Sequence, residues 1–189
     1  TGSKNQLSDT WEWDGKDWAD VTPAEVRDAT DLKRVFRRRG HSMAYDARRG
    51  ALVVNGGEFP TGETETTYVR ENDGRWLEDL AEQGPPWLDR PGLAYDARRK
   101  RVVLFGGRFR DGDVGYKGFA ETWERSGERW EKRKPSASPS GRSNHCMVYD
   151  AARGRVMVHG GSDSNDLWEY DGETWVRKNP AGSPPHRWN

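Results

Sequence analysis

The four histidines and the single cysteine are the side chains in this chain that could bind a transition metal or act as a nucleophile. His41 and His145 each precede a Tyr-Asp pair by four residues, so they occupy equivalent places in two similar segments. A third similar segment has Pro91 at that place, which excludes a symmetric ring of metal-binding histidines. Recurrence at one place in a repeat favours packing or hydrogen bonding, so no metal site is predicted at these histidines.

The remaining candidates also lack partners at the spacing that a catalytic or metal site needs; they are Cys146, His159 and His186. A lone cysteine forms no intramolecular disulfide, and Cys146 lies in a short apolar run where a core position is expected. Four acidic side chains could contact calcium, but they do not follow the EF-hand pattern and are interpreted as solvated loop carboxylates; they are Asp111, Asp113, Asp163 and Asp166. We therefore predict no catalytic residue, no metal site and no cofactor.

The charges of the chain balance, with 31 Lys and Arg residues against 31 Asp and Glu residues, and this gives no electrostatic case for a nucleic-acid partner. The one basic run, Arg37 to Arg39, is expected to be a solvated loop because no aromatic ladder accompanies it. No stretch approaches the roughly 18 apolar residues of a membrane span. The composition does not distinguish a secreted from a cytoplasmic protein.

Aromatic residues compensate for a low hydrophobic content of 32%, which by itself would favour disorder. The chain has ten Trp, six Tyr and five Phe, and each buried aromatic side chain removes about 150–250 Å² from water. A few such side chains can anchor a thin core built from strands. The 22 Gly and 10 Pro residues supply the turns of an all-β protein.

Three segments share one internal repeat, in which an apolar run ends in Tyr-Asp, a polar turn with Arg follows, and a β-branched run ends in Gly-Gly. Their tyrosines, at 45, 95 and 149, are 50 and 54 residues apart. Each segment is typical of a hairpin, and the paired glycines fit a place where the backbone bends sharply or passes close to a neighbour. These structural glycines are Gly56, Gly57, Gly106, Gly107, Gly160 and Gly161.

A second pattern alternates with the first and consists of two aromatic runs joined by Asp-Gly or Ser-Gly. Its copies end at four tryptophans with a predicted structural role: Trp18, Trp76, Trp130 and Trp175. Asp-Gly between strands is the strongest short hairpin signal, and it predicts a positive φ at Gly15, Gly74 and Gly172. Each unit of about 50 residues therefore contains four predicted strands.

Together these residues resemble the kelch repeat, through the Gly-Gly ending, the spacing of Tyr and Trp, and the period. The Tyr-Asp-x-x-Arg turn and the Trp-Glu-Tyr-Asp-Gly hairpin are similar to bacterial kelch or galactose-oxidase-like repeats. The resemblance covers nearly the whole chain. It implies an all-β fold of four-stranded antiparallel blades arranged around the axis of a β-propeller.

Within this interpretation, the single propeller segment 1–189 comprises three complete blades and one N-terminal half-blade. The expected ranges are a half-blade at 1–20, an inserted link at 21–38, blades at 39–80, 90–134 and 142–179, and the start of a further link at 180–189. The link contains a predicted short helix that begins near Thr22 and Pro23 and continues to Phe36. Propellers close with about four to eight blades. We therefore expect either self-association into an oligomer or a continuation into a longer propeller.

Long connections gather on one face of the predicted blades, and insertions on one face of a repeat array usually mark its binding face. They span 58–65, 108–120 and 162–166, with links at 84–88 and 135–140. The candidate binding residues in them are Phe59, Trp87, Arg108, Phe109, Arg110, Asp111, Tyr116 and Asp163.

The sequence thus predicts a non-catalytic binding or scaffolding propeller that presents these loops to a protein or a carbohydrate. The alternative is an oxidase-like or lyase-like enzyme, or a metal-binding propeller, whose site is completed by residues outside this chain.

Overall fold

The computed structural model describes residues 7–23, 38–59, 62–63, 67–79, 83–112 and 115–182. These residues form strands and turns without an α-helix, which confirms the all-β prediction. The predicted helix falls on residues 24–37, which lie outside the described residues, as does Asp113. In the described part of the chain, no helix has the length and apolar character that crossing a membrane would require.

Three four-stranded antiparallel sheets follow one another along the chain, and in each the strands lie in sequence order. The first sheet consists of β3 (Ser42–Asp46), β4 (Ala51–Asn55), β7 (Thr67–Arg70) and β8 (Trp76–Asp79). The second consists of β9 (Gly92–Asp96), β10 (Arg101–Phe105), β13 (Thr122–Ser126) and β14 (Arg129–Arg133). The third consists of β15 (Cys146–Asp150), β16 (Arg155–His159), β17 (Leu167–Tyr170) and β18 (Trp175–Lys178).

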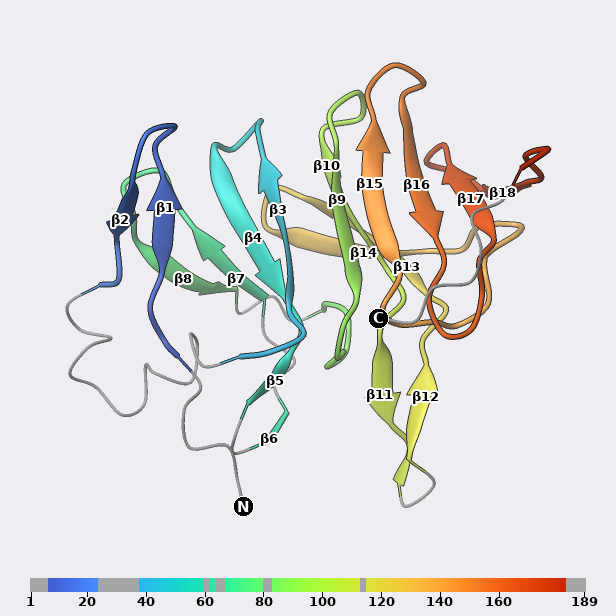
Figure 1. Cartoon of the computed structure of the whole chain (residues 1–189), viewed down its shortest axis with the longest axis horizontal. Coiled ribbons are helices and arrows are strands. Elements are labelled where there is room, and N and C mark those ends of the chain that lie inside the picture. The colour runs from blue at the N-terminus through green and yellow to red at the C-terminus, as the bar shows by residue number, and fades with distance from the viewer. Residues whose placement is uncertain are drawn as a thin grey trace.

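Three two-stranded hairpins complete the described structure. They are β1 (Trp11–Trp13) with β2 (Trp18–Asp20), β5 (Glu58–Phe59) with β6 (Gly62–Glu63), and β11 (Arg108–Arg110) with β12 (Tyr116–Gly118). None of the described sheets closes on itself. In Figure 1 the hairpins β5–β6 and β11–β12 project from the lower side of the sheets, whereas the turns β3–β4, β9–β10 and β15–β16 lie at the upper side. The two long connections that the sequence left as irregular loops therefore contain paired strands.

The Asp-Gly turns have the predicted backbone geometry. The φ angles of Gly15, Gly74 and Gly172 are 97°, 86° and 106°, which confirms the expected positive values. In each turn, the preceding aspartate accepts a hydrogen bond from a backbone N–H two residues farther on, as the Asp171 carboxylate does from Glu173 at 2.8 Å. Local chemistry therefore fixes these three hairpins.

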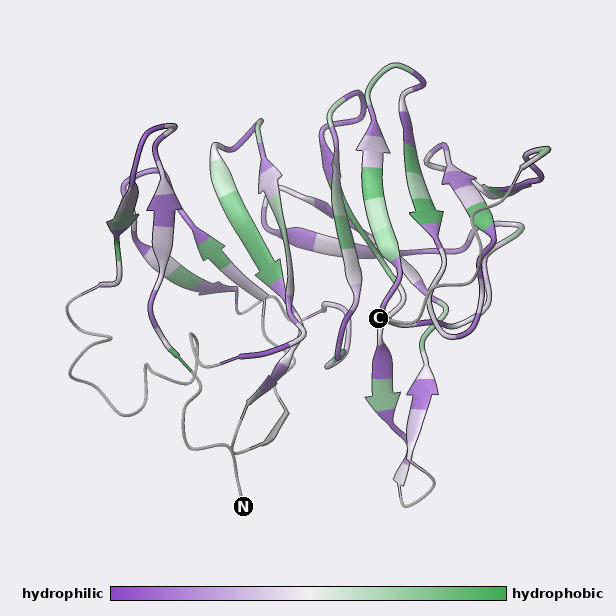
Figure 2. Cartoon of the chain, in the orientation of Figure 1, coloured by the Kyte–Doolittle hydropathy of each residue, from purple (hydrophilic) through white to green (hydrophobic). Residues whose placement is uncertain are grey.

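The second sheet is buried on both faces because side chains of β10 alternate between two cores. Val102 and Leu104 pack toward the first sheet, and Val103 and Phe105 pack toward the third. A strand covered on both faces reads as a continuous apolar run, as this one does. In Figure 2 the hydrophobic colour is concentrated along β4, β15 and β16, and the outlying strands β1 and β12 are mainly hydrophilic.

The contacts between sheets recur with the sequence repeat. The indole Nε1 of Trp130 donates to the Thr67 hydroxyl at 3.0 Å, and Trp175 donates to Thr122 at 2.9 Å in the same way. Trp130 and Trp175 are buried, as predicted for a structural role, and Trp76 is half-buried. The second sheet therefore sits on the first as the third sits on the second.

A tyrosine near the end of the first strand of the following sheet, on β9 and on β15, repeats this relation. The Tyr95 hydroxyl accepts a hydrogen bond from the backbone N–H of Arg48 at 3.1 Å, and the Tyr149 hydroxyl accepts one from Arg98 at 3.1 Å. Each tyrosine thereby ties its own sheet to the turn of the preceding one.

The Gly-Gly pairs follow the second strand of a sheet and contact the segment that leads into the first strand of the following sheet. The Gly57 N–H donates to the Leu88 carbonyl at 2.8 Å, and the Gly107 N–H donates to the Arg142 carbonyl at 2.8 Å. A Cβ added at Gly56 would lie 2.4 Å from the Leu88 carbonyl oxygen, so only glycine fits there. This close approach confirms the prediction made from the Gly-Gly pattern.

Candidate binding surface

The hairpins β5–β6 and β11–β12 come from equivalent places in neighbouring sheets, and a hydrogen bond joins them. Each connects the second and third strands of its sheet. The Tyr116 hydroxyl on β12 donates to the Glu58 carboxylate on β5 at 2.6 Å, although 58 residues separate them. The Arg108 guanidinium lies 4.2 Å from the centre of the Tyr116 ring. Two segments distant in the sequence thus form one surface.

Ion pairs anchor this surface to the sheets. Arg39 donates to Glu58 at 2.7 Å, and Arg108 pairs with the buried Asp89 at 2.7 Å. We call Arg39, Glu58, Asp89, Arg108 and Tyr116 the hairpin cluster. Because two guanidinium groups face two carboxylates, the cluster is held together without a net charge.

Hydrogen bonding within the hairpin cluster shifts two pKa values apart. The bond from Tyr116 and the ion pair with Arg39 lower the pKa of Glu58, although partial burial opposes them. The same bond to Glu58 raises the pKa of Tyr116. Glu58 is therefore a carboxylate and Tyr116 a neutral phenol at pH 7.

The predicted binding residues of β11, β12 and the turn between them lie in three different environments. Arg108 and Tyr116 belong to the hairpin cluster, and the Tyr116 side chain is 51% exposed. Arg110 and Asp111 are exposed at the end of β11, with Asp111 at 3.8 Å from Lys117. Phe109 instead packs edge-on against Phe119, 6.2 Å between ring centres, and contacts the core.

The other predicted binding residues are not members of the hairpin cluster. Trp87 is only 6% exposed and donates its Nε1–H to the Gly57 carbonyl at 2.8 Å, so its indole packs within the fold. Asp163 is exposed in the turn between β16 and β17 of the third sheet. The backbone of Phe59 pairs with Gly62, and its side chain lies outside the description.

The hairpin cluster contains three residues that were not predicted, namely Arg39, Glu58 and Asp89. Arg39 and Asp89 each bridge to the first residue of a hairpin, as isolated pairs with Glu58 and Arg108. The sequence signal is their equivalent position, one residue before Gly40 and Arg90, which both have positive φ. The repeat alignment alone could have found that position, but not the contact with Tyr116.

The basic run before the first sheet is less solvated than expected. Arg38 donates to the Gly56 carbonyl at 3.1 Å and lies 4.8 Å from the centre of the Tyr68 ring. Burial lowers the pKa of Arg38 to about 10. Arg37 lies outside the described residues. Arg38 is therefore a structural ligand of a backbone carbonyl, which corrects the solvated-loop interpretation for that residue. Arg39 remains exposed while it pairs with Glu58.

Trp18, which was predicted to have a structural role, and Cys146, for which a core position was expected, are both exposed. Trp18 is 60% exposed, because no described element covers the outer face of β1–β2. Cys146 is exposed on β15, the first strand of the third sheet. The core position expected for Cys146 is therefore wrong, whereas the exposure of Trp18 fits a half-blade without a covering neighbour among the described residues.

The two equivalent histidines have packing environments. His145 lies edge-on to Phe105, 5.7 Å between ring centres, and against Gly106. Burial, with Arg142 nearby, lowers the pKa of His145 to about 4, and burial also lowers the pKa of His41. Among the described residues, no group of three or more His, Cys, Asp or Glu side chains is placed to hold a metal ion.

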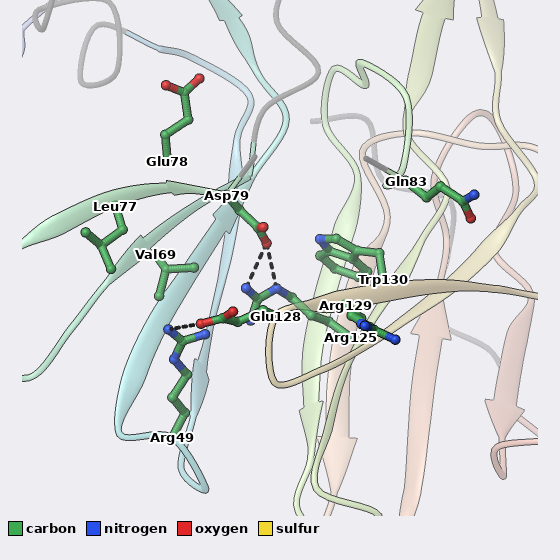
Figure 3. Close-up of a pocket in the computed structure, with 10 residues that line it drawn as sticks. All are labelled: Arg49, Val69, Leu77, Glu78, Asp79, Gln83, Arg125, Glu128, Arg129 and Trp130. Atoms are coloured by element: carbon green, nitrogen blue, oxygen red, sulfur yellow. Dashed lines mark hydrogen bonds and ion pairs between the residues drawn. The ribbon is translucent and has the colours of Figure 1, made fainter. Parts of the chain in front are cut away.

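A pocket of about 700 Å³ lies between the first and second sheets, away from the hairpin cluster. Figure 3 shows Arg125 reaching from the second sheet to Asp79 of the first, and Arg49 reaching Glu128. Arg125 is 1% exposed and bonds to Asp79 at 2.7 Å, so its charge is already neutralised. The pocket's ion pairs join the two sheets and leave little unpaired charge for a ligand.

Comparison with models of known protein families gave no match, and neither did comparison with curated proteins.

Proposed function

We propose that the three four-stranded sheets are kelch-type blades of a β-propeller. The support is the repetition of the contacts between sheets: indole to threonine, tyrosine hydroxyl to turn N–H, and glycine N–H to the next segment's carbonyl. When each unit contacts the next through the same head-to-tail interface, the units form a ring if the rotation from one unit to the next adds up to a full turn. The sheets span 42–79, 92–133 and 146–178, one to each sequence repeat.

The N-terminal hairpin β1–β2 corresponds to the outer half of a further blade. Its Trp13 and Trp18 pair across the strands as Tyr170 and Trp175 do in the third sheet. Trp175 is buried against the second sheet, whereas Trp11, Trp13 and Trp18 are half or more exposed. We propose that another blade covers this aromatic face in the functional assembly, because exposed aromatic patches and unpaired strand edges favour association.

The function that this geometry supports best is non-catalytic recognition of a protein or a carbohydrate at the hairpin cluster. The observation that carries the proposal is the Tyr116–Glu58 hydrogen bond, which fixes two projecting hairpins relative to each other. A surface fixed in advance loses less conformational entropy on binding than separate loops do. Tyr and Arg are also the side chains that most often dominate binding energy.

The proposal is tested by screening the purified chain against an array of glycans and a library of peptides, and then measuring the affinity of each hit. We expect Arg110→Ala combined with Tyr116→Ala to weaken binding by about tenfold or more, which is about 1.4 kcal/mol. The matched control is Arg129→Ala, an exposed arginine on the outer strand β14. Unchanged affinity in the double variant contradicts the assignment. A stoichiometric transition metal in the purified protein would favour the alternative of a metal-binding propeller.

A further inference from the structure

A second pocket, of about 480 Å³, lies between the second and third sheets. Its lining comes from the turns β9–β10, β15–β16 and β17–β18, together with strand residues beneath them. In Figure 1 the turns β9–β10 and β15–β16 lie on the side opposite the hairpins β5–β6 and β11–β12. This pocket is therefore separate from the hairpin cluster.

Arginines dominate the lining of this pocket. They are Arg98, Arg99, Arg101, Arg133 and Arg155. Only three carboxylates accompany them, from Glu124, Asp171 and Glu173. The chain as a whole has no net charge, so this excess of positive charge is a local feature. We call these five side chains the arginine pocket.

The equivalent pocket between the first and second sheets provides an internal comparison. It has three arginines, Arg49, Arg125 and Arg129, and three carboxylates, from Glu78, Asp79 and Glu128. The two pockets occupy equivalent positions, one between the first and second sheets and the other between the second and third. The excess of arginine is therefore specific to the pocket between the second and third sheets, and the contact between neighbouring sheets does not require it.

One arginine forms the fixed floor of the arginine pocket. Arg99 donates to Asp96 at 2.7 Å and also to Glu124, and both carboxylates are buried. Its Nη2 is buried without a hydrogen-bond partner among the described residues. The guanidinium carbon also lies 5.2 Å from the centre of the Tyr170 ring, so the ring and the two carboxylates together fix the orientation of Arg99.

The other arginines retain unused hydrogen-bond donors. The Nε atoms of Arg101 and Arg133 form ion pairs with the Glu124 carboxylate at 3.9 Å and 3.8 Å, beyond hydrogen-bond range. Arg133 also donates from Nη2 to the Gly172 carbonyl at 3.5 Å. Arg155 donates one N–H to the Gly154 carbonyl at 3.2 Å. The Arg98 side chain makes no hydrogen bond or ion pair with the described part of the chain. Since each guanidinium carries five N–H donors, most of them remain available.

We propose that the arginine pocket binds the phosphate or sulfate group of a small molecule. Such a group offers at least three acceptor oxygens, which match several guanidinium forks at once. The pocket volume falls within the range of about 300–1,000 Å³ that is usual for small-molecule sites. Glu124 is already engaged by Arg99 and sets the depth to which the anion enters. The site is additional to the proposed recognition of a protein or carbohydrate.

Titration calorimetry with inorganic phosphate, pyrophosphate and sulfate tests this proposal, with sodium chloride holding the ionic strength constant. We expect saturable binding by the intact chain, and the order of the three affinities distinguishes a phosphate site from a sulfate site. Arg101→Gln combined with Arg155→Gln should weaken binding by about tenfold or more. Both side chains are partly exposed, and circular dichroism and the melting midpoint show whether the variant folds.

Arg129→Gln is the matched control, because Arg129 lines the equivalent neutral pocket. We expect it to bind the anions as the parent chain does. The proposal is overturned by the absence of saturable binding up to millimolar concentrations. It is also overturned if the control loses as much affinity as the double variant, since that identifies a general charge effect. Tyr116→Ala should leave anion binding unchanged, which keeps this result independent of the hairpin cluster.

Discussion

Substituting Gly172 by alanine tests how the third sheet is seated on the second. Gly172 has a φ of 106°, and a Cβ there would lie 2.5 Å from Nη1 and 2.7 Å from Cζ of Arg99. The substitution therefore imposes backbone strain and displaces the guanidinium that bonds to Glu124 and Asp96. Both effects should lower the free energy of unfolding.

The matched control is Gly74→Ala in the equivalent turn of the first sheet. Gly74 has a φ of 86°, but a Cβ there meets only the Arg70 Nη2 at 3.5 Å, an ordinary contact. Strain at a positive φ costs about 1–3 kcal/mol in both variants. Losing one charge-assisted hydrogen bond of Arg99 adds roughly 1.5–3 kcal/mol in Gly172→Ala alone. For a chain of this length, an extra 2 kcal/mol corresponds to about 4–8 °C in the melting midpoint.

Urea unfolding followed by tryptophan fluorescence measures both free energies. We expect Gly172→Ala to be less stable than Gly74→Ala by the Arg99 contribution. In an Arg99→Ala background that difference should vanish, since the displaced group is gone. Equal midpoints for the two glycine variants would refute the close packing of the β17–β18 turn on Arg99.

Other consequences of the structure can be measured separately. Trp175→Phe removes the buried hydrogen bond to Thr122 and should cost about 1–3 kcal/mol in urea unfolding; a change below about 0.5 kcal/mol would count against that bond. Tyr116→Phe should raise the pKa of Glu58 measured by NMR, because the bond that lowers it is lost, and an unchanged titration would argue against the link between the hairpins. Because the folded chain holds His145 with a pKa of about 4 against an ordinary 6.5, the unfolded chain takes up a proton first, and stability should fall as the pH drops from about 6.5 to about 4. A His145→Gln variant should lose less stability over that pH range, and an identical loss would contradict this explanation. Light scattering over a dilution series should detect self-association through the exposed tryptophans of β1–β2, and a monomer at all concentrations with those tryptophans shielded from a quencher would contradict it.

Local sequence signals predicted the strands and turns of the three sheets. Asp-Gly between aromatic runs determines a positive φ without reference to the rest of the chain, as at Gly172. The continuous apolar run of β10 is typical of a strand covered on both faces, and its successive side chains do pack into two cores. The same reasoning should have found the hairpin β11–β12, because Asp111-Gly112 lies between its strands and is a turn signal.

Contacts between residues that are far apart in the sequence could not be predicted. Tyr116 meets Glu58 only because two connections from adjacent sheets leave on the same side. Trp87 follows two prolines in a link, where an exposed position was expected, yet it fills the space beside Gly57. The pocket that contains the five arginines is lined by residues between 98 and 173. The chain as a whole has equal numbers of positive and negative residues, so the local excess of arginine is visible only in the structure.

The glycine pairs and the indole–threonine bonds also determine how the length of such a chain can change. Every step from one sheet to the next uses the same donor and acceptor positions, so a duplicated unit of about 50 residues meets its neighbours through contacts that already exist. A deletion of one whole unit likewise brings together two compatible surfaces. Loss of a single strand leaves a threonine without its indole or a glycine pair without its carbonyl. Gene duplication can therefore change the number of units in whole steps, while the boundaries of each unit stay fixed.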